Sequence, residues 1–364
     1  MGSFGLAARA AIMGCLVALV LGVAYVIVQN GDSRPTIRPV VRTPPVTATV
    51  ASPTELGTGR AAMASGRAGL WVVRQPPNRS HGQLIQFRMP DGEAQQPIAL
   101  DLSPVSVAVG ARDVWVLGTR RASTLAVLER IDPSTGRVRA RAALAEAPAC
   151  LTRAFASCYP VVTRHGVWVP LSDTVVRVEP SGKMADRNVQ VEGHLWDVTS
   201  DGGRWVWAIA EVGLYRIDER TGHMRRWALR DLLHDGLLQP NHIVANEKAV
   251  WISCFPRRGN RPRGQLIHVV PGRDPTIPQT PRLYPGAGSL ALVGGGLWLD
   301  RYDGEGELDR LSQLTGDLTG PFVSVPDDVV AIAPRAGDLW LLSYQPDGNK
   351  RTVTKVDLSP ASSG

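Results

Sequence analysis

The sequence predicts an all-β protein, a seven-bladed β-propeller of four-stranded blades, preceded by one N-terminal transmembrane helix. Three observations lead to this prediction: a Trp-centred motif that recurs seven times, a composition rich in turn formers, and one long uncharged segment near the N-terminus. The 364 residues include 37 Gly and 28 Pro, which is typical of many turns between short strands. The hydrophobic fraction of 44% is enough for a sizeable core.

The uncharged segment predicts the membrane span. It runs from Ala10 to Val28, and as an α-helix at about 1.5 Å per residue it would span about 28 Å, close to the thickness of a bilayer core. The apolar part of a cleaved signal peptide is only about 7–15 residues long and leads to a small-x-small cleavage site, which does not follow here. We therefore expect an uncleaved signal anchor over residues 10–29, after a cytoplasmic head of residues 1–9.

The charges that flank the span do not favour one orientation. Only Arg9 precedes the span, whereas Arg34, Arg38 and Arg42 follow it, so the positive-inside rule does not support export of the larger part. Long domains are translocated largely regardless of flanking charge. We expect a single-pass protein of the cell membrane with its propeller on the extracytoplasmic side. Residues 30–45 hold four Pro and predict an extended stalk, which at about 3.1 Å per residue could reach about 50 Å.

The recurring motif is a small residue, an apolar residue, Trp and another apolar residue. Its copies are separated by 44, 53, 39, 44, 47 and 42 residues, a period of about 45. The seven repeat Trp residues are Trp71, Trp115, Trp168, Trp207, Trp251, Trp298 and Trp340. Each lies mid-strand between apolar neighbours, where we expect its ring to pack between adjacent blades.

The surroundings of each Trp predict four strands per repeat. An apolar strand precedes the Trp strand, and a third strand ends in a hairpin with Asp or Pro at its start and Gly where a positive φ is needed. These hairpins are Asp132 to Gly136, Glu179 to Gly182 and Asp218 to Gly222. Units of about 45 residues with four strands describe propeller blades, and seven such units fill a closed ring.

The last repeat has no fourth strand of its own, because the chain reaches Ser359 and Pro360 after the third. Val46 to Val50 has strand composition and precedes the first repeat. We expect this segment to become the outer strand of the last blade, which would join the ends of the ring and protect an open edge. The propeller is therefore predicted over residues 46–360, followed by a tail of residues 361–364.

The Ile-Asp-x-x-Thr-Gly hairpins and the preceding Val-Trp-Val resemble the blades of NHL/YVTN-type and quinoprotein-like bacterial propellers, including the group that contains streptogramin B lyase. The resemblance covers about residues 46–358. It implies the fold, and it implies either a binding module or an enzyme. For a lyase it implies a Glu-x-His at the start of an inner strand, which Glu192 and His194 match, with His242 as the counterpart in the next blade.

The lyase pattern is matched only in part. Those lyases also repeat Glu three residues after each Trp, and none of the seven corresponding positions here is Glu. Quinoproteins place a Trp after nearly every Thr-Gly, and Trp227 is the only residue so placed. A metal-dependent lyase or hydrolase at the channel mouth is therefore the alternative function, and solvated loop histidines are the structural alternative. We expect no cofactor and no bound metal.

The cysteines predict one disulfide in the exported domain. Cys150 and Cys158 lie in the longest interval between repeat Trp residues, and an oxidising compartment favours their pairing over free thiols. Cys15 lies in the predicted span. Cys254 is then the odd thiol, and we expect it to be buried at a strand end.

Two charged loops predict a binding face. The fifth blade carries Arg257, Arg258, Arg261 and Arg263 without an acid, and we call these four residues the basic loop. Guanidinium groups match phosphate geometry, so the loop predicts an anionic partner such as a cell-wall phosphate polymer or lipid headgroups. The sixth blade carries acids over residues 300–307, in a spacing that does not fit an EF-hand. The alternative is that the two loops neutralise each other.

Charge also limits the function. The net charge is +7, but residues 1–50 hold four Arg against one Asp, which leaves only +4 on the other 314 residues. This balance does not predict the dense basic face of a nucleic-acid-binding protein. We expect a membrane-anchored binding or scaffold module with an anionic envelope ligand or a protein partner, rather than an enzyme.

Overall fold

The computed structural model describes residues 50–358, apart from 78–80, 89–90, 121–124, 145–158, 187, 229–237, 257–262, 273–281, 286, 302–305, 320–321, 326–327, 336 and 346–349. These residues belong to one compact unit, Thr43–Gly364. The predicted span and stalk lie outside the described residues. Within the described part, no helix is long and apolar enough to cross a bilayer.

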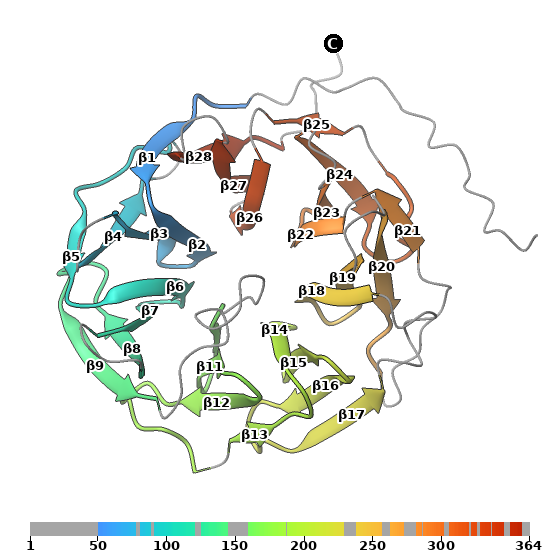
Figure 1. The fold of residues 1–364 in the computed structure, drawn as a ribbon, viewed down its shortest axis with the longest axis horizontal. Coiled ribbons are helices and arrows are strands. Elements are labelled where there is room, and N and C mark those ends of the chain that lie inside the picture. The colour runs from blue at the N-terminus through green and yellow to red at the C-terminus, as the bar shows by residue number, and fades with distance from the viewer. Residues whose placement is uncertain are drawn as a thin grey trace, which may run out of the picture. The chain divides into compact units, whose positions relative to one another are not determined.

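Seven four-stranded antiparallel sheets form a ring around a central channel, which confirms the predicted seven-bladed propeller (Figure 1). Each sheet is one blade, and its innermost strand faces the channel. From the innermost strand outward, blade 1 is β2 (Arg60–Gly66), β3 (Gly69–Gln75), β4 (Gly82–Phe87) and β5 (Ile98–Leu100); blade 2 is β6 (Ser103–Val109), β7 (Val114–Thr119), β8 (Ala126–Ile131) and β9 (Val138–Ala143); blade 3 is β10 (Val161–Thr163), β11 (Gly166–Pro170), β12 (Thr174–Val178) and β13 (Val189–Gln190).

The remaining blades repeat this order. Blade 4 is β14 (Leu195–Ser200), β15 (Trp205–Ala210), β16 (Gly213–Asp218) and β17 (Met224–Ala228); blade 5 is β18 (Leu238–Ala245), β19 (Val250–Pro256), β20 (Arg263–Val269) and β21 (Arg282–Pro285); blade 6 is β22 (Ala287–Val293), β23 (Gly296–Arg301), β24 (Glu307–Ser312) and β25 (Val323–Ser324); blade 7 is β26 (Asp328–Arg335), β27 (Asp338–Gln345), β28 (Lys350–Val356) and β1 (Thr54–Thr58).

The N-terminal segment closes the ring, but not with the residues expected. The outer strand of blade 7 is β1, which pairs antiparallel with β28, whereas the sequence predicted Val46 to Val50 for this position. Val50 forms only an isolated bridge to Val356, and residues 46–49 lie outside the described part. Gly59 explains the shift, because its φ of 119° and a Cβ position only 2.2 Å from the Gln75 carbonyl oxygen force an immediate turn from β1 into β2.

The repeat Trp residues fill the spaces between blades, as predicted. All seven are at most 5% exposed. The ring of Trp251 in blade 5 contacts the hairpin of blade 6, where a Cβ on Gly316 would lie 2.7 Å from Trp251 Cη2. Gly92 of blade 1 has the same relation to Trp340 of blade 7. At these two junctions the ring of the repeat Trp therefore packs on the turn of the next blade, whereas Gly136 and Gly182 approach Ile98 and the Ala140–Arg141 segment of the preceding blade instead.

A basic side chain adds a second contact between blades. Arg130, Arg177 and Arg216 pair directly with the repeat Trp of their own blades, and their guanidinium carbons lie 5.8–5.9 Å from the ring centroids. Each guanidinium also donates to a backbone carbonyl in the outer hairpin of the next blade. The acceptors are, in the same order, Pro180, Glu219 and Gly272. Blades 2 to 5 are thereby connected by three equivalent contacts.

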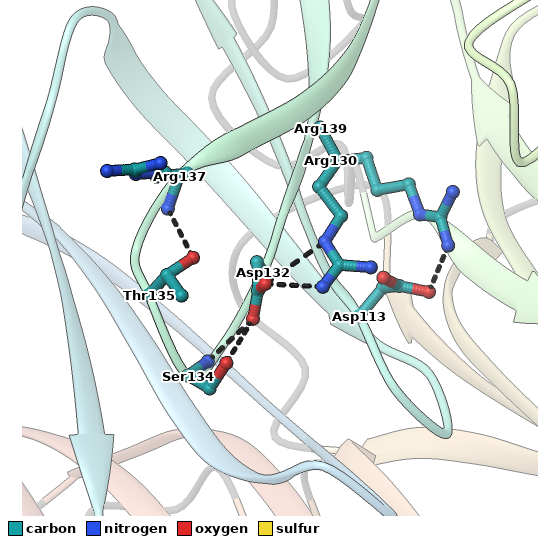
Figure 2. A network of polar contacts seen from close by, with 7 residues as sticks. All are labelled: Asp113, Arg130, Asp132, Ser134, Thr135, Arg137 and Arg139. Atoms are coloured by element: carbon teal, nitrogen blue, oxygen red, sulfur yellow. Dashed lines mark hydrogen bonds and ion pairs between the residues drawn. The ribbon is translucent and has the colours of Figure 1, made fainter.

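The outer hairpins of blades 2 and 4 are capped by their first Asp. Figure 2 shows that one carboxylate oxygen of Asp132 accepts hydrogen bonds from the backbone N–H and the hydroxyl of Ser134, at 2.9 and 2.6 Å. The other oxygen accepts from Nε of Arg139 at 3.1 Å. Gly136 then turns the chain with φ 68°, as the sequence predicted. Asp218 caps the corresponding hairpin of blade 4 with bonds from the Thr221 N–H and from Arg204.

These caps predict an acid-sensitive contribution to stability. Hydrogen bonds from Ser134 and Arg139 hold the pKa of Asp132 well below its usual range. Burial acts to raise the pKa of Asp218, but the bonds from Thr221 and Arg204 lower it to about 2. A carboxylate whose pKa is depressed by folding contributes stability above its unfolded pKa of about 4, and this contribution is lost as the pH falls toward the folded value.

We expect the double variant Asp132→Asn and Asp218→Asn to have a lower free energy of unfolding than the wild type at pH 7. Between about pH 4 and pH 2, its free energy of unfolding should decrease less than that of the wild type. Urea unfolding at each pH measures this difference. The matched control is Asp91→Asn with Asp101→Asn, because both side chains are exposed. An acid-induced decrease as large in the cap variant as in the wild type would contradict the role assigned to the caps.

Candidate functional site

A polar cluster lies on one side of the central channel. In every blade one residue of the innermost strand pairs with the repeat Trp, and the residue two positions before this partner is a corresponding position of the repeat. In chain order these residues are Ala62, Ser106, Tyr159, Asp197, His242, Ser289 and Ala331. The larger polar residues therefore come from the consecutive blades 3, 4 and 5. We call Tyr159, Asp197 and His242 the channel cluster.

Asp197 organises the cluster from β14. It is only 1% exposed, and its two carboxylate oxygens accept hydrogen bonds from the N–H of Val198 at 2.9 Å and the N–H of Ile243 at 3.1 Å. Its second oxygen also lies 3.6 Å from Nε2 of His242. Burial raises the pKa of Asp197, while His242 and the two N–H groups act in the opposite direction. Asp197 thus connects the inner strands of blades 4 and 5 and orients the imidazole.

The imidazole of His242 lies near both this carboxylate and the ring of Tyr159. The Tyr159 and His242 rings meet edge to face with centroids 6.3 Å apart. Burial, with a contribution from the charge of Asp197, raises the pKa of Tyr159 to about 12, so its hydroxyl stays protonated at neutral pH. Nδ1 of His242 is buried and has no hydrogen-bond partner among the described residues. A fixed imidazole can donate or accept a hydrogen bond at this atom.

The cluster borders the channel cavity. This cavity has a volume of about 570 Å³, and Tyr159 and His242 both line it. Small-molecule sites in proteins have volumes of about 300–1,000 Å³ and combine an apolar wall with a few polar groups. The channel cavity is therefore of a size that admits a small organic ligand.

The other residues of the lyase-like alternative do not join His242 in this cluster. Glu192 is exposed and forms an ion pair with Arg226 on β17, the outermost strand of blade 4. His194 is 7% exposed and packs edge-on against Trp196, with centroids 4.9 Å apart. The carboxylate beside His242 is that of Asp197. Across the described residues, no group of three His, Cys, Asp or Glu side chains is placed to hold a metal ion.

Only one residue of the basic loop, Arg263, lies among the described residues. Arg257, Arg258 and Arg261 lie outside the described residues, and Arg263 begins β20, where its backbone pairs with Pro285 of β21. The segment 257–262 connects β19 to β20, two strands that are paired from Val250 to Cys254. Of the acidic residues in the neighbouring loop, Glu307 is 6% exposed and forms an ion pair with Arg301 of its own blade.

The cysteine predictions are tested only at one position. Cys150 and Cys158 lie outside the described residues. Cys254 is a free thiol, fully buried in β19, which confirms the expected burial. Burial raises the pKa of this thiol well above its usual range, so it stays protonated.

Sequence reasoning found His242 but missed Asp197 and Tyr159. The signal that could have found them is an alignment of the repeats on their Trp residues, because Tyr159, Asp197 and His242 precede the repeat Trp of their blades by 9, 10 and 9 residues. A search by motif spacing along the chain does not reveal this, since the three residues are separated by about 40 residues.

Comparison with known proteins supports the fold. Neither a protein-family model nor a curated protein matches the chain. Among solved structures, hydrazine synthase of Kuenenia stuttgartiensis matches with a TM-score of 0.59 and 10% identity over 85% of this chain and 98% of that one. The Cps50 (Swd1) β-propeller domain of Myceliophteria thermophila matches with a TM-score of 0.54 and 11% identity over 83% and 98%. BamB of Moraxella catarrhalis has a TM-score of 0.47 and 13% identity over 87% and 100%.

At such identities a structural likeness shows the fold alone, and one fold can carry many unrelated functions. The resemblance to NHL/YVTN-type propellers therefore stays a prediction at the level of family. The chain is a seven-bladed β-propeller of four-stranded blades.

Proposed function

We propose that this protein is a membrane-tethered binding module whose propeller is held outside the cytoplasm and binds an anionic ligand of the cell envelope through the basic loop. The ligand class is a phosphate-bearing polymer or lipid headgroup, and a protein partner is the other occupant to be tested. The main support for an anionic ligand is that acidic side chains of blade 6 already pair with an Arg of their own blade.

This pairing argues against the main alternative, in which the acidic loop of blade 6 neutralises the basic loop. Glu307 already has a cationic partner in Arg301, which lies at the end of β23 in the same blade. Asp309 also lies near this guanidinium, 3.7 Å from its Nε. An acid that is buried and paired within its own blade is a poor counter-ion for a neighbouring loop, and this supports an external anion as the partner of the basic loop.

The closure of the ring supports the tether. The described chain enters the propeller at the rim of blade 7, where the Ala51 N–H donates to the Lys355 carbonyl at 3.0 Å and Val50 bridges Val356. The predicted stalk and span precede this point directly in the sequence. A force on the stalk would therefore act on the strand pair β1–β28. The membrane anchor and the closing strand would belong to one continuous segment of the chain.

Replacing Arg257, Arg258, Arg261 and Arg263 by Ser is expected to abolish retention of the propeller on phosphatidylglycerol vesicles. The reason is the loss of four guanidinium donors to phosphate, whereas the cost to stability should be small, because exposed ion pairs contribute only about 0–1 kcal/mol each. Co-sedimentation with vesicles measures retention, and thermal unfolding measures stability.

The matched control removes the same charge elsewhere. Its four substitutions to Ser are at exposed positions outside the basic loop, namely Arg60, Arg112, Arg137 and Arg220. Equal retention of both quadruple variants would show that total charge, rather than this loop, is responsible. If the basic-loop variant instead loses stability in a way that salt restores, the loop pairs with the acidic loop of blade 6, and the proposal is wrong.

A further inference from the structure

We propose that the mouth of the channel cavity binds a small organic molecule that carries two phosphate groups. The site is formed by one Arg from each of four consecutive blades, and we call these residues the arginine arc: Arg335 of blade 7, Arg67 of blade 1, Arg112 of blade 2 and Arg164 of blade 3. This inference does not depend on the basic loop or on the tether. It rests on the shared position of the four residues, on the contacts between their hairpins and on the charges around them.

The four Arg residues occupy corresponding hairpins. Each lies in, or at the edge of, the hairpin that joins the first strand of its blade to the second. Blades 7, 1, 2 and 3 follow one another around the ring, and their first strands face the channel (Figure 1). Arg67 and Arg335 line the channel cavity, and the side chains of Arg67, Arg112 and Arg164 are exposed. The arginine arc therefore borders part of the mouth of the channel.

Direct contacts hold these hairpins together. Between blades 7 and 1, a guanidinium nitrogen of Arg335 donates to the Gly66 carbonyl. Between blades 1 and 2, the Ala68 N–H donates to the Gly110 carbonyl at 3.1 Å. Between blades 2 and 3, a Cβ on Gly110 would lie 3.1 Å from Cγ1 of Val162. The four hairpins thus form a connected series, which fixes the order of the Arg residues and keeps them close to one another.

The acids of these hairpins do not neutralise the arginine arc. Asp113 of blade 2 forms an ion pair with Arg130 at 2.7 Å, and Asp338 of blade 7 forms one with Lys355 at 2.9 Å. Both carboxylate side chains are at most 17% exposed. None of the described residues that line the channel cavity is acidic. The nearby negative charges therefore already have cationic partners on the third strands of their own blades.

The positive charge is concentrated at one side of the channel mouth. In the described part of the chain, no carboxylate pairs with the three exposed members of the arginine arc. The corresponding hairpins of blades 4 and 5 differ, because Arg204 bonds with Asp218 at 2.7 Å and Lys248 has Glu247 beside it in the sequence. A cleft bordered by one sign of charge attracts a ligand of the opposite sign.

The class of ligand follows from the number and the kind of these groups. Four guanidinium groups carry four positive charges, and two phosphate monoesters carry about three to four negative charges at pH 7. Phosphate oxygens also match the forked donors of Arg. The cavity volume of about 570 Å³ is sufficient for a molecule of the size of a sugar bisphosphate.

The arginine arc and the basic loop lie at opposite ends of the propeller. The hairpins of the arc join first strands to second strands, whereas the segment 257–262 joins a second strand to a third. A ligand at the arc is therefore separate from a ligand at the basic loop, and the two sites can be tested independently.

The probe that matches these features is fructose 1,6-bisphosphate. Its comparators are fructose 6-phosphate, which has one phosphate, and citrate, which replaces phosphates by carboxylates. Titration calorimetry on the full chain in phosphatidylcholine nanodiscs, with empty nanodiscs as the baseline, is expected to show saturable binding of the bisphosphate. We expect the affinity for each comparator to be at least about tenfold lower, and the affinity for the bisphosphate to fall as salt screens the charges.

Matched variants locate the site. The double variant Arg67→Gln and Arg112→Gln is expected to weaken binding of the bisphosphate at least about tenfold. Its control is Arg60→Gln with Arg120→Gln, which removes two exposed charges at the other end of the propeller and should leave the affinity unchanged. The basic-loop variant should also keep this binding. Thermal unfolding of each variant shows whether the fold is retained.

The proposal is overturned if fructose 1,6-bisphosphate shows no saturable binding above the nanodisc baseline, or if either comparator binds as tightly. It is also overturned if the arc variant and its control have equal effects, since the arc would then not be the site. If the basic-loop variant alone abolishes binding, the bisphosphate binds at the other end of the propeller. This inference would then be wrong while the proposed function stands, so the two can fail separately.

Discussion

A chain that begins at Ala61 is expected to lose its ability to form a stable monomeric ring, whereas a chain that begins at Val46 is expected to fold. The shorter chain lacks β1, so the edge of β28 becomes unpaired and the blade 7 sheet has three strands. It also lacks Leu56, which is 3% exposed and packs in a cluster with Met63, Trp340 and Val353. Burial of one Leu and the strand pairing together are worth at least about 3 kcal/mol.

Size-exclusion chromatography and thermal unfolding of both chains measure this effect. A third chain that begins at Pro53 is the control, because it keeps β1 and, among the described residues, removes the contacts of Val50 and Ala51. We expect this control to resemble the chain from Val46. The chain from Ala61 should aggregate, since an exposed edge strand is a template for pairing with other chains. Equal monomer yield and equal melting temperature for the Ala61 and Val46 chains would rule out closure by β1.

Gly316→Ala is expected to destabilise the propeller much more than Gly294→Ala. Both glycines have positive φ, 68° and 58°, so each substitution carries a similar backbone cost of about 1 kcal/mol. A Cβ at position 316 would also lie 2.7 Å from Cη2 of Trp251, whereas nothing lies within 4 Å of a Cβ at position 294. Overpacking against a fully buried ring adds about 1–3 kcal/mol.

Denaturant unfolding measures the free energy of unfolding of each variant. The difference between the two values isolates the contact between blades 5 and 6, because the backbone costs of the two substitutions cancel. Trp251 Nε1 donates to the Gln313 carbonyl at 2.9 Å in the same hairpin, so the ring has little freedom to move away. If the two variants had equal unfolding free energies, the repeat Trp would not pack on the hairpin of the next blade as described.

The repeats made most of the fold predictable. The seven Trp positions determined the number of blades, because a buried Trp recurs in every blade, and Asp and Gly at fixed spacing determined the outer hairpins of blades 2 and 4. The exact closing strand was not predictable from composition. Val46 to Val50 is richer in β-branched residues than Thr54 to Thr58, but the close approach of Gly59 to β3 selects the later segment.

The candidate sites were predictable to a smaller extent. His242 was identified as the counterpart in blade 5 of the Glu-x-His of blade 4, and its carboxylate neighbour is Asp197 of blade 4. Glu192, which the pattern places beside His194, forms an ion pair with Arg226 on the outermost strand of blade 4. In a propeller, side chains at corresponding positions of neighbouring repeats come together, although they are far apart along the chain. Local motifs therefore do not reveal which side chains meet in the channel.

The salt dependence of retention on phosphatidylglycerol vesicles, compared between the full chain and the chain that begins at Val46, tests the central proposal most directly. The chain from Val46 should bind at low salt and be released as salt screens the basic loop, because the Debye length falls from about 30 Å at 0.01 M to about 8 Å at 0.15 M. The reconstituted full chain should remain with the vesicles at every salt concentration, since a membrane span does not depend on charge. Release of the full chain by salt would contradict the tether, and salt-independent or absent retention of the Val46 chain would contradict the anionic ligand.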